Sequence, residues 1–330
     1  MMFRKLVLTA AILAYAVVVF GAFVRLSNAG LGCPDWPGCY GRLAVPQSAP
    51  ARGIAHLEFP NKPLDNAKAW IEMTHRYLAG TLALLIVAIA VYASRKRAEL
   101  QQSPLLSLLL AGLVALQALL GMWTVTLLLK PVVVSLHLLG GMVTLALLCW
   151  LALRQYARPT VYAVSRDSLK FWGWLGLGLL AVQIALGGWV SANYAALACG
   201  GFPLCNGSWL PKMDFSAGFQ LVGSEGTTSG NTLSNLALAS INWTHRLGAL
   251  IVLCYLASLA IAVLRIKRLQ KYGVLLLTIV CLQVALGIGN VLLSRPLPLA
   301  VAHNAAAALL LVVMVVLNFN LSSSGVDDGL

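Results

Sequence analysis

Long apolar runs alternate with short polar segments along most of this chain. A helix that crosses a bilayer needs ~20 predominantly apolar residues, and backbone groups in lipid must be paired within the segment. Each apolar run is therefore predicted to be a membrane-spanning helix, and the alternation typical of a membrane β-barrel is absent. The eight predicted spans cover residues 5–26, 70–93, 104–128, 132–153, 171–193, 237–264, 273–293 and 299–319.

The second half of the chain repeats the first. The segment VRLSNAGLGCPDWPGC from Val24 is matched by VSANYAALACGGFPLC from Val190, and MTHR is matched by WTHR. His137 recurs as His303 at an offset of 166 residues (303 − 137). Such internal similarity indicates a duplicated structural unit.

Four spans per half return the chain to the side on which it started, so both halves have the same orientation in the membrane. Parallel repeats of this kind are related by an axis along the membrane normal. The predicted fold is an all-α integral membrane protein made of two pseudo-symmetric four-helix bundles, one formed by residues 1–160 and the other by residues 161–330.

Composition and charge narrow the class of protein. With 60% hydrophobic residues, 10% charged residues and a mean hydropathy of +0.85, the chain has too few charges to cover a soluble domain. The net charge of +13 does not indicate a nucleic-acid partner, because Lys and Arg cluster at alternate ends of the spans as the positive-inside rule requires. The clusters are Arg4–Lys5, Arg95–Arg97, Arg154–Lys170 and Arg265–Lys271.

This charge distribution predicts a multi-pass protein with both termini in the cytoplasm. The first span is not followed by a small-residue cleavage site, and no transit peptide rich in Arg and Ser precedes it, so we expect a retained helix in a bacterial cytoplasmic (inner) membrane. The long polar segments 27–69 and 194–236 then face the outer side.

Four of the five histidines occupy repeated positions and are the main candidates for chemistry. Each lies near the outer start of a predicted span, roughly 6–12 Å deep at 1.5 Å per residue. Two imidazoles that face each other across a bundle suit axial ligation of haem iron. The four candidates are His75, His137, His245 and His303.

Other interpretations of these histidines stay open. An intramembrane histidine can simply hydrogen-bond a neighbouring helix, and zinc fits less well because no i, i+4 pair or Cys/His cluster lies at this depth. The sequence does not decide whether His75 pairs with His137 or with His245. Arg76 and Arg246, which directly follow two of the histidines, are either partners of haem propionates or side chains that reach membrane lipid headgroups.

The two halves differ at one acidic position. Glu72 precedes His75 by three residues, which places both side chains on one helix face, whereas the matching position before His245 is Asn242. A carboxylate at this depth could shuttle protons or hold a reacting group; alternatively, it is a helix-start glutamate favoured by the macrodipole. The asymmetry favours a reaction in the first bundle and electron transfer alone in the second.

Two cysteine pairs lie in the outer segments. Cys33/Cys39 and Cys199/Cys205 each have five residues between their members, and outside the cytoplasm such pairs are expected to form disulfides. A structural staple is the default interpretation for the second pair. A redox role is open to either pair, because exposed disulfides in short loops can be labile.

An ordered set of motifs runs through the chain: VRLSNAGLGCPDWPGC, EMTHR, LQALLGMWTV, SLH, NWTHR and AHN. With the duplicated eight-span layout, this set resembles the haem A synthase family over essentially the whole chain. The resemblance implies an oxidoreductase that oxidises a methyl group of haem O to a formyl group by successive hydroxylations, giving haem A for terminal oxidases. It also implies that the N-terminal half binds the substrate haem O and that the C-terminal half holds haem b.

The resemblance further implies roles for particular residues. The ligands of the haem O iron would be His75 and His137, and those of the haem b iron would be His245 and His303. Glu72 matches the functionally important glutamate of the family. The pair Cys33/Cys39 matches cysteines implicated in catalysis, and the second pair is expected to be structural.

Implied partners are haem O and haem A, membrane lipid, a haem O synthase, cytochrome oxidase assembly factors and an electron donor whose identity does not transfer. The sequence is compatible with a monomer and with a homo-oligomer. Two other functions also fit paired histidines: a dihaem b-type electron carrier linked to quinol, and a haem transporter or chaperone without catalysis. The one-sided Glu72 favours the enzyme, and the parallel repeat is unlike the inverted repeats of many transporters.

Overall fold

The computed structural model describes residues 2–100, 102–156, 167–221 and 233–322 of the chain. Eight of its helices are long and apolar enough to cross a membrane. This confirms the predicted all-α integral membrane protein with eight spans. Within those residues no β-strand forms beyond two isolated bridges, Cys39 with Arg42 and Cys205 with Ser208. The predicted connection between the halves includes residues 157–166, which lie outside the described residues.

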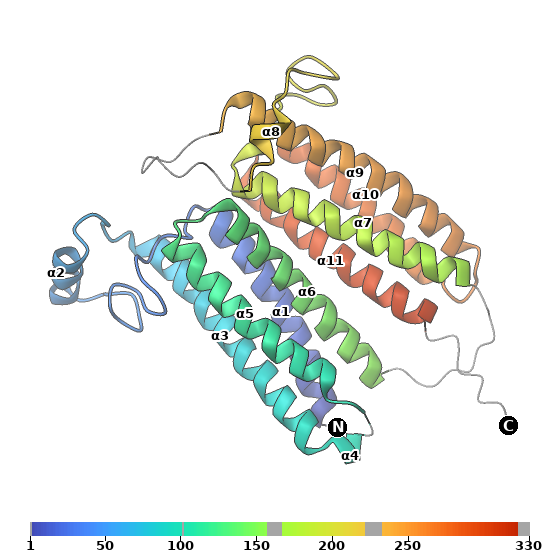
Figure 1. Ribbon diagram of the computed structural model, residues 1–330, viewed down its shortest axis with the longest axis horizontal. Coiled ribbons are helices and arrows are strands. Elements are labelled where there is room, and N and C mark those ends of the chain that lie inside the picture. Colours follow the sequence, from blue (N-terminus) through green and yellow to red (C-terminus); the bar gives the residue numbers. More distant parts are fainter. Residues whose placement is uncertain (1, 101, 157–166, 222–232, 323–330) are drawn as a thin grey trace. The chain divides into compact units, whose positions relative to one another are not determined.

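The chain divides into two compact units, Met1–Arg158 and Pro159–Leu330. In the first unit, four long helices run side by side (Figure 1). Helix α1 packs against α3 and α6, and α5 packs against the same two helices, so α3 and α6 are diagonally opposed. The helices of this unit are α1 (Met2–Leu26), α2 (Ala49–Glu58), α3 (Asn66–Arg95), α4 (Arg97–Leu100), α5 (Leu105–Thr126) and α6 (Pro131–Tyr156).

The second unit repeats this order of packing. Helix α7 packs against α9 and α11, and α10 packs against the same two helices, so α9 and α11 are diagonally opposed. Its elements are α7 (Asp167–Ala192), the 3₁₀ helix η1 (Ala195–Leu197), α8 (Phe215–Gly218), α9 (Asn235–Leu264), α10 (Gln270–Leu292) and α11 (Leu297–Ser322).

Local signals fix where the histidine-bearing helices begin. The side chain of Asp65 caps α3 by accepting a hydrogen bond from the N–H of Lys68 (3.1 Å), and Ser234 caps α9 in the same way through the N–H of Ala237 (3.2 Å). Helices α6 and α11 follow tight turns in which two consecutive non-glycine residues have positive φ. Those residues are Leu128, Leu129, Ser294 and Arg295.

Candidate functional site

The structure places two of the four predicted histidines in each unit. His75 lies on α3 and His137 on α6, the diagonally opposed helices of the first unit. His245 on α9 and His303 on α11 have the same relation in the second unit. The arrangement within each unit is the one that lets two imidazoles approach a ligand from opposite sides of a bundle.

Each imidazole ring lies against a glycine of a neighbouring helix. An ideal Cβ atom built at these glycines would lie between 2.9 and 3.4 Å from Cε1 of the ring, so a larger side chain would displace the imidazole. The four glycines occupy repeated positions at the offset of 166 residues, which a comparison of the two halves of the sequence could have found. The pairs are Gly21–His75, Gly121–His137, Gly187–His245 and Gly287–His303.

The ring nitrogens differ in their partners. In the part of the chain that the structure describes, Nδ1 of His75, His137 and His303 is buried without a hydrogen-bond partner. Nδ1 of His245 lies 3.0 Å from the amide nitrogen of Gln183. Leaving a buried polar atom without a partner costs about 1–3 kcal/mol. The rings are held against small residues on diagonally opposed helices, which suits them to hold haem iron between them.

Glu72 lies one helical turn before His75 and is only 4% exposed. Its Oε1 forms an ion pair with Nη2 of Arg76 at 2.6 Å, and its Oε2 accepts a hydrogen bond from the backbone N–H of Cys33 at 2.9 Å. Both charges of the ion pair are shielded, with 6% of the glutamate side chain and 12% of the arginine side chain exposed. The site thus contains a carboxylate that is held in place on both oxygens.

The matching residue of the second unit has the opposite hydrogen-bonding role. Asn242 is also 4% exposed, but its Nδ2 donates to the carbonyl oxygens of Ala195 and Ala196, both at 2.9 Å. A carboxylate at this position could not donate these bonds. The difference between Glu72 and Asn242 in the sequence is therefore also a difference in what the two side chains do.

The two arginines that recur in the repeat hold the disulfide-containing loops against the helices. Nη1 of Arg76 donates to the carbonyl oxygens of Asp35 (2.9 Å), Pro37 (3.2 Å) and Gly38. In this way α3 fixes the loop that contains the first disulfide. A role of Arg76 at a haem propionate stays a prediction.

Arg246 makes the corresponding contacts in the second unit. Its Nη1 donates to the carbonyl oxygens of Gly201 (2.9 Å) and Leu204 (3.2 Å), and its Nη2 donates to Cys199 at 2.6 Å. In the first unit, the matching Nη2 atom binds Glu72 instead. The propionate role predicted for Arg246 likewise stays a prediction.

Both predicted disulfides are present. The S–S distance is 1.99 Å in Cys33–Cys39 and 1.97 Å in Cys199–Cys205. The first disulfide is buried in a small apolar cluster that packs directly on α3 beside Glu72. This cluster consists of Cys33, Cys39, Tyr40, Val45, Ala55, Ala69 and Met73.

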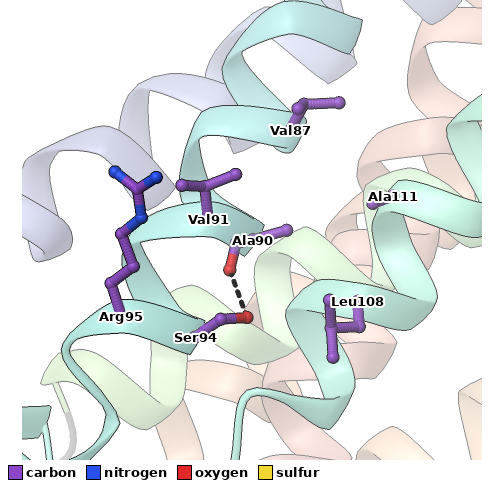
Figure 2. A pocket seen from close by; sticks show the side chains of 7 residues that line it. All are labelled: Val87, Ala90, Val91, Ser94, Arg95, Leu108 and Ala111. Atoms are coloured by element: carbon purple, nitrogen blue, oxygen red, sulfur yellow. Dashed lines mark hydrogen bonds between the residues drawn. The ribbon is translucent and has the colours of Figure 1, made fainter.

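A groove of about 400 Å³ lies between α3 and α5, far from the histidines. It is lined by apolar side chains, with Arg95 at one end and the Ser94 hydroxyl bonded to the carbonyl oxygen of Ala90 at 2.8 Å (Figure 2). Arg95 is twenty residues beyond His75 on the same helix, which is about 30 Å at 1.5 Å per residue. The groove is therefore not part of the histidine site.

The chain is similar to known proteins over most of its length. A protein of Shewanella oneidensis named Heme A synthase is 41% identical over 305 residues, covering 92% of this chain and 92% of its own length. A protein with the same name from Chelativorans sp. is 30% identical over 318 residues, covering 90% of this chain and 84% of the relative. The family model described as cytochrome oxidase assembly protein, COX15-CtaA, matches residues 4–315. The chain therefore belongs to the COX15-CtaA family of cytochrome oxidase assembly proteins.

Proposed function

We propose that this protein is a haem A synthase, an oxidoreductase that binds haem O and oxidises one of its methyl groups to the formyl group of haem A. The observation that carries the proposal is the buried carboxylate of Glu72 beside His75, opposed to the amide of Asn242 beside His245. A carrier that only relays electrons has no need for a proton acceptor in one unit alone. The family and the names of the relatives support the same activity.

The two units are proposed to hold different haems. Residues 1–160 would bind the substrate, haem O, through His75 and His137, and residues 161–330 would hold haem b through His245 and His303. Support comes from the diagonal placement of the histidines within each unit and from the four glycines that leave room for their rings. When bound, haem b supplies one-electron redox chemistry.

The residues of the first unit supply binding, orientation and proton transfer. Where water supplies the oxygen atoms, the successive hydroxylations of the methyl group would consume water and release protons and electrons, and the electrons would pass to an external electron acceptor. The resulting hydrated aldehyde would then lose water to give the formyl group. Glu72 is the group placed to accept those protons, since it is buried on the same helix face as His75. Arg76 and the N–H of Cys33 hold the carboxylate in position, and the disulfide cluster covers the outer end of α3.

The proposed location is a bacterial cytoplasmic membrane, with both termini and the basic loops in the cytoplasm. The basic clusters at alternate ends of the spans support this orientation. It places the two disulfides on the oxidising outer side, where such bonds persist. Proposed partners are membrane lipid, a haem O synthase, cytochrome oxidase assembly factors and an unidentified electron-transfer partner.

Haem extraction after co-expression tests the activity. The protein would be produced with a haem O synthase in cells that lack a haem A synthase of their own, and the extracted haems would be separated by chromatography. A new formyl-bearing haem that depends on both proteins is the expected result. Recovery of haem b alone, with reversible reduction, would instead indicate an electron carrier, and unchanged haem O bound to the protein would indicate a transporter or chaperone.

A further inference from the structure

Gln183 on α7 bridges the ring and the backbone of His245. Its Nε2 atom lies 3.0 Å from Nδ1 of the imidazole and 3.0 Å from the carbonyl oxygen of the same residue. One amide group therefore fixes the rotation of the ring relative to α9. Gly187, one turn further along α7, gives the same ring its space, because a Cβ atom there would lie 3.2 Å from Cε1.

The first unit lacks this arrangement. The offset of 166 that relates Gly187 to Gly21 also relates Gln183 to Val17, whose side chain has no polar atom. The amide of Gln183 occupies space above Gly248, where a Cβ atom would collide with Oε1. Alignment of WTHRLG with MTHRYL places Leu78 at the position of Gly248. Beside the first histidine of the repeat, the amide and the space for it are thus found in the second unit only. Beside the second histidine of the first unit, the amide of Gln117 lies against Gly140 on α6.

The contact involves the ring nitrogen that iron does not use. Histidine usually ligates haem iron through Nε2, with the proton on Nδ1 donated to a neighbouring acceptor that orients the ring and raises its basicity. Oε1 of Gln183 is buried and has no hydrogen-bond partner among the described residues. Rotation of the terminal amide would bring this oxygen to Nδ1, in exchange for the present bond from Nε2 to the carbonyl oxygen of His245. Gln283, by contrast, lies 3.3 Å from Nε2 of His303 and so approaches the other nitrogen.

We propose that Gln183 is a positioning residue that orients His245 and, through its amide oxygen, accepts a hydrogen bond from the Nδ1–H group when Nε2 binds iron. Its effect is to hold the haem of the second unit as a permanent cofactor and to lower its midpoint potential, since a more basic ligand favours ferric iron. His75 receives no such support from Val17, which suits a unit whose haem must leave as product. The proposal rests on the assignment of haem b to the second unit.

Redox titration of the second haem tests this role. Variants would be made in a full-length His137→Ala background, so that the absorption bands report the haem held by His245 and His303. Gln183→Val, which installs the residue of the first unit, should raise the midpoint potential and speed haem transfer to apomyoglobin by roughly 10- to 100-fold, the usual cost of losing a ligand's outer partner. Gln183→Glu, a stronger acceptor, should lower the potential.

A third variant removes the contact without removing the glutamine. Gly248→Leu fills the space of the amide with the residue of the first unit, and it should shift the potential and the transfer rate in the same direction as Gln183→Val. Gly178→Ala is the matched control on α7, because no atom lies within 4 Å of a Cβ built there. It should leave both values at those of the parent protein.

Opposite shifts in the Val and Glu variants would support the role, because a residue that only fills space would not respond to the strength of the acceptor. Unchanged potentials in Gln183→Val and Gln183→Glu would overturn it. Loss of haem from Gln183→Val, Gln183→Glu and Gly248→Leu alike, with the helical circular dichroism unchanged, would also overturn it. The carboxylate of Gln183→Glu should restore the hydrogen bond, so that variant should keep its haem. Failure of the proposed activity is a different result: the wild-type protein would then yield no formyl-bearing haem, whatever the potentials of the Gln183 variants.

Discussion

Glu72 has the surroundings that a proton acceptor in a membrane helix requires. An isolated buried carboxylate is costly, and a nearby opposite charge with additional hydrogen bonds offsets that cost. Here one oxygen binds Arg76 and the other accepts the N–H of Cys33. His75 follows three residues later on the same face. The carboxylate is therefore fixed beside the predicted iron ligand while its charge is compensated.

Replacement of Glu72 by Gln should separate binding from turnover. The glutamine keeps an oxygen that can accept the N–H of Cys33 but loses the charge and the ability to take a proton. We expect formyl-haem production to fall by ~10²-fold or more, the usual contribution of general acid–base catalysis, while haem content stays at the wild-type level. Glu99→Gln is the control, because that exposed glutamate only pairs with Lys96 at 3.1 Å. Wild-type turnover in Glu72→Gln would refute a catalytic role.

The glycines beside the histidines give a second residue-scale prediction. A Cβ atom at Gly21 would lie 2.9 Å from Cε1 of His75, which is too close without movement of the ring. Gly21→Ala should therefore weaken haem O binding and reduce product, measured by haem extraction, while the haem b spectrum is retained. Gly80→Ala on α3 meets no atom within 4 Å and should behave like wild type. Equal effects of the two substitutions would contradict this explanation.

At the scale of elements, the same type of arginine contact joins the disulfide loop to a histidine-bearing helix in both units. An arginine that follows the histidine donates to carbonyl oxygens of the disulfide loop, at Asp35 and Gly38 in one unit and at Gly201 and Leu204 in the other. In the first unit Glu72 is inserted between the arginine and the loop. Because Glu72 bonds both Arg76 and the loop, the conformation of the disulfide loop is coupled to a carboxylate in the first unit, whereas Asn242 takes that position in the second unit.

Tyr40 gives this loop a pH dependence. Burial raises the pKa of its phenol above the ordinary value of about 10, and the carboxylates of Asp35, Asp65 and Glu72 raise the pKa further. The neutral phenol donates to the carbonyl oxygen of Lys62 at 3.1 Å. Because the folded-state pKa is raised, this contribution to stability is complete below about pH 10 and is lost as the pH rises through the raised pKa.

An ultraviolet titration of tyrosinate formation measures this effect. Subtracting the titration curve of Tyr40→Phe from that of the wild type leaves the titration of Tyr40 alone. This tyrosine should ionise at a higher pH than an ordinary tyrosine. The thermal stability of the wild type should fall over that same alkaline interval, whereas that of Tyr40→Phe should not show this part of the decrease. A difference component at the ordinary pKa would mean that the phenol is not buried as described.

Much of the architecture could be predicted from the sequence, because hydrophobic runs and repeats report directly on spanning helices. The spans and both disulfides follow from local patterns. The contacts between elements do not. Gln183 and His245 are 62 residues apart, and Cys33 and Glu72 are 39 apart. Such pairs depend on the rotation and depth of neighbouring helices, which periodicity leaves undefined.

Side-chain partners were also hard to predict where several were chemically suitable. The contacts of Arg76 and Arg246 with loop carbonyl oxygens do not follow from the sequence pattern, and their role at haem propionates or lipid headgroups stays a prediction. The short helix α2, within the first disulfide-containing loop, is amphipathic but much shorter than a membrane span, so the search for long apolar runs does not reveal it. A capping serine before it, Ser48, was the local sign of its start.

On the scale of the whole molecule, the duplication keeps the framework and changes the chemistry. Both units have two histidines, a glycine beside each of them, and an arginine that binds carbonyl oxygens of the disulfide loop. Glu72 and Gln183 do not recur, and each lies beside the first histidine of its own unit. In the proposed function, the first unit would therefore contain the proton acceptor beside its first histidine, and the second unit would contain the amide that supports its first histidine. This division is what the proposed assignment of haem O to the first unit and haem b to the second would require.

Single histidine variants test that division directly. His75→Ala should abolish formyl-haem formation and leave the reversible haem b spectrum intact, because its ring belongs to the first unit alone. His245→Ala should instead lower the content of haem b, measured as the pyridine haemochrome, while haem O still binds at His75 and His137. His56→Ala, in the exposed outer helix α2, is the matched control and should change neither. Because each ligand pair lies within one unit, the two effects should be separable; loss of both haems from either variant would show that the units do not bind them independently.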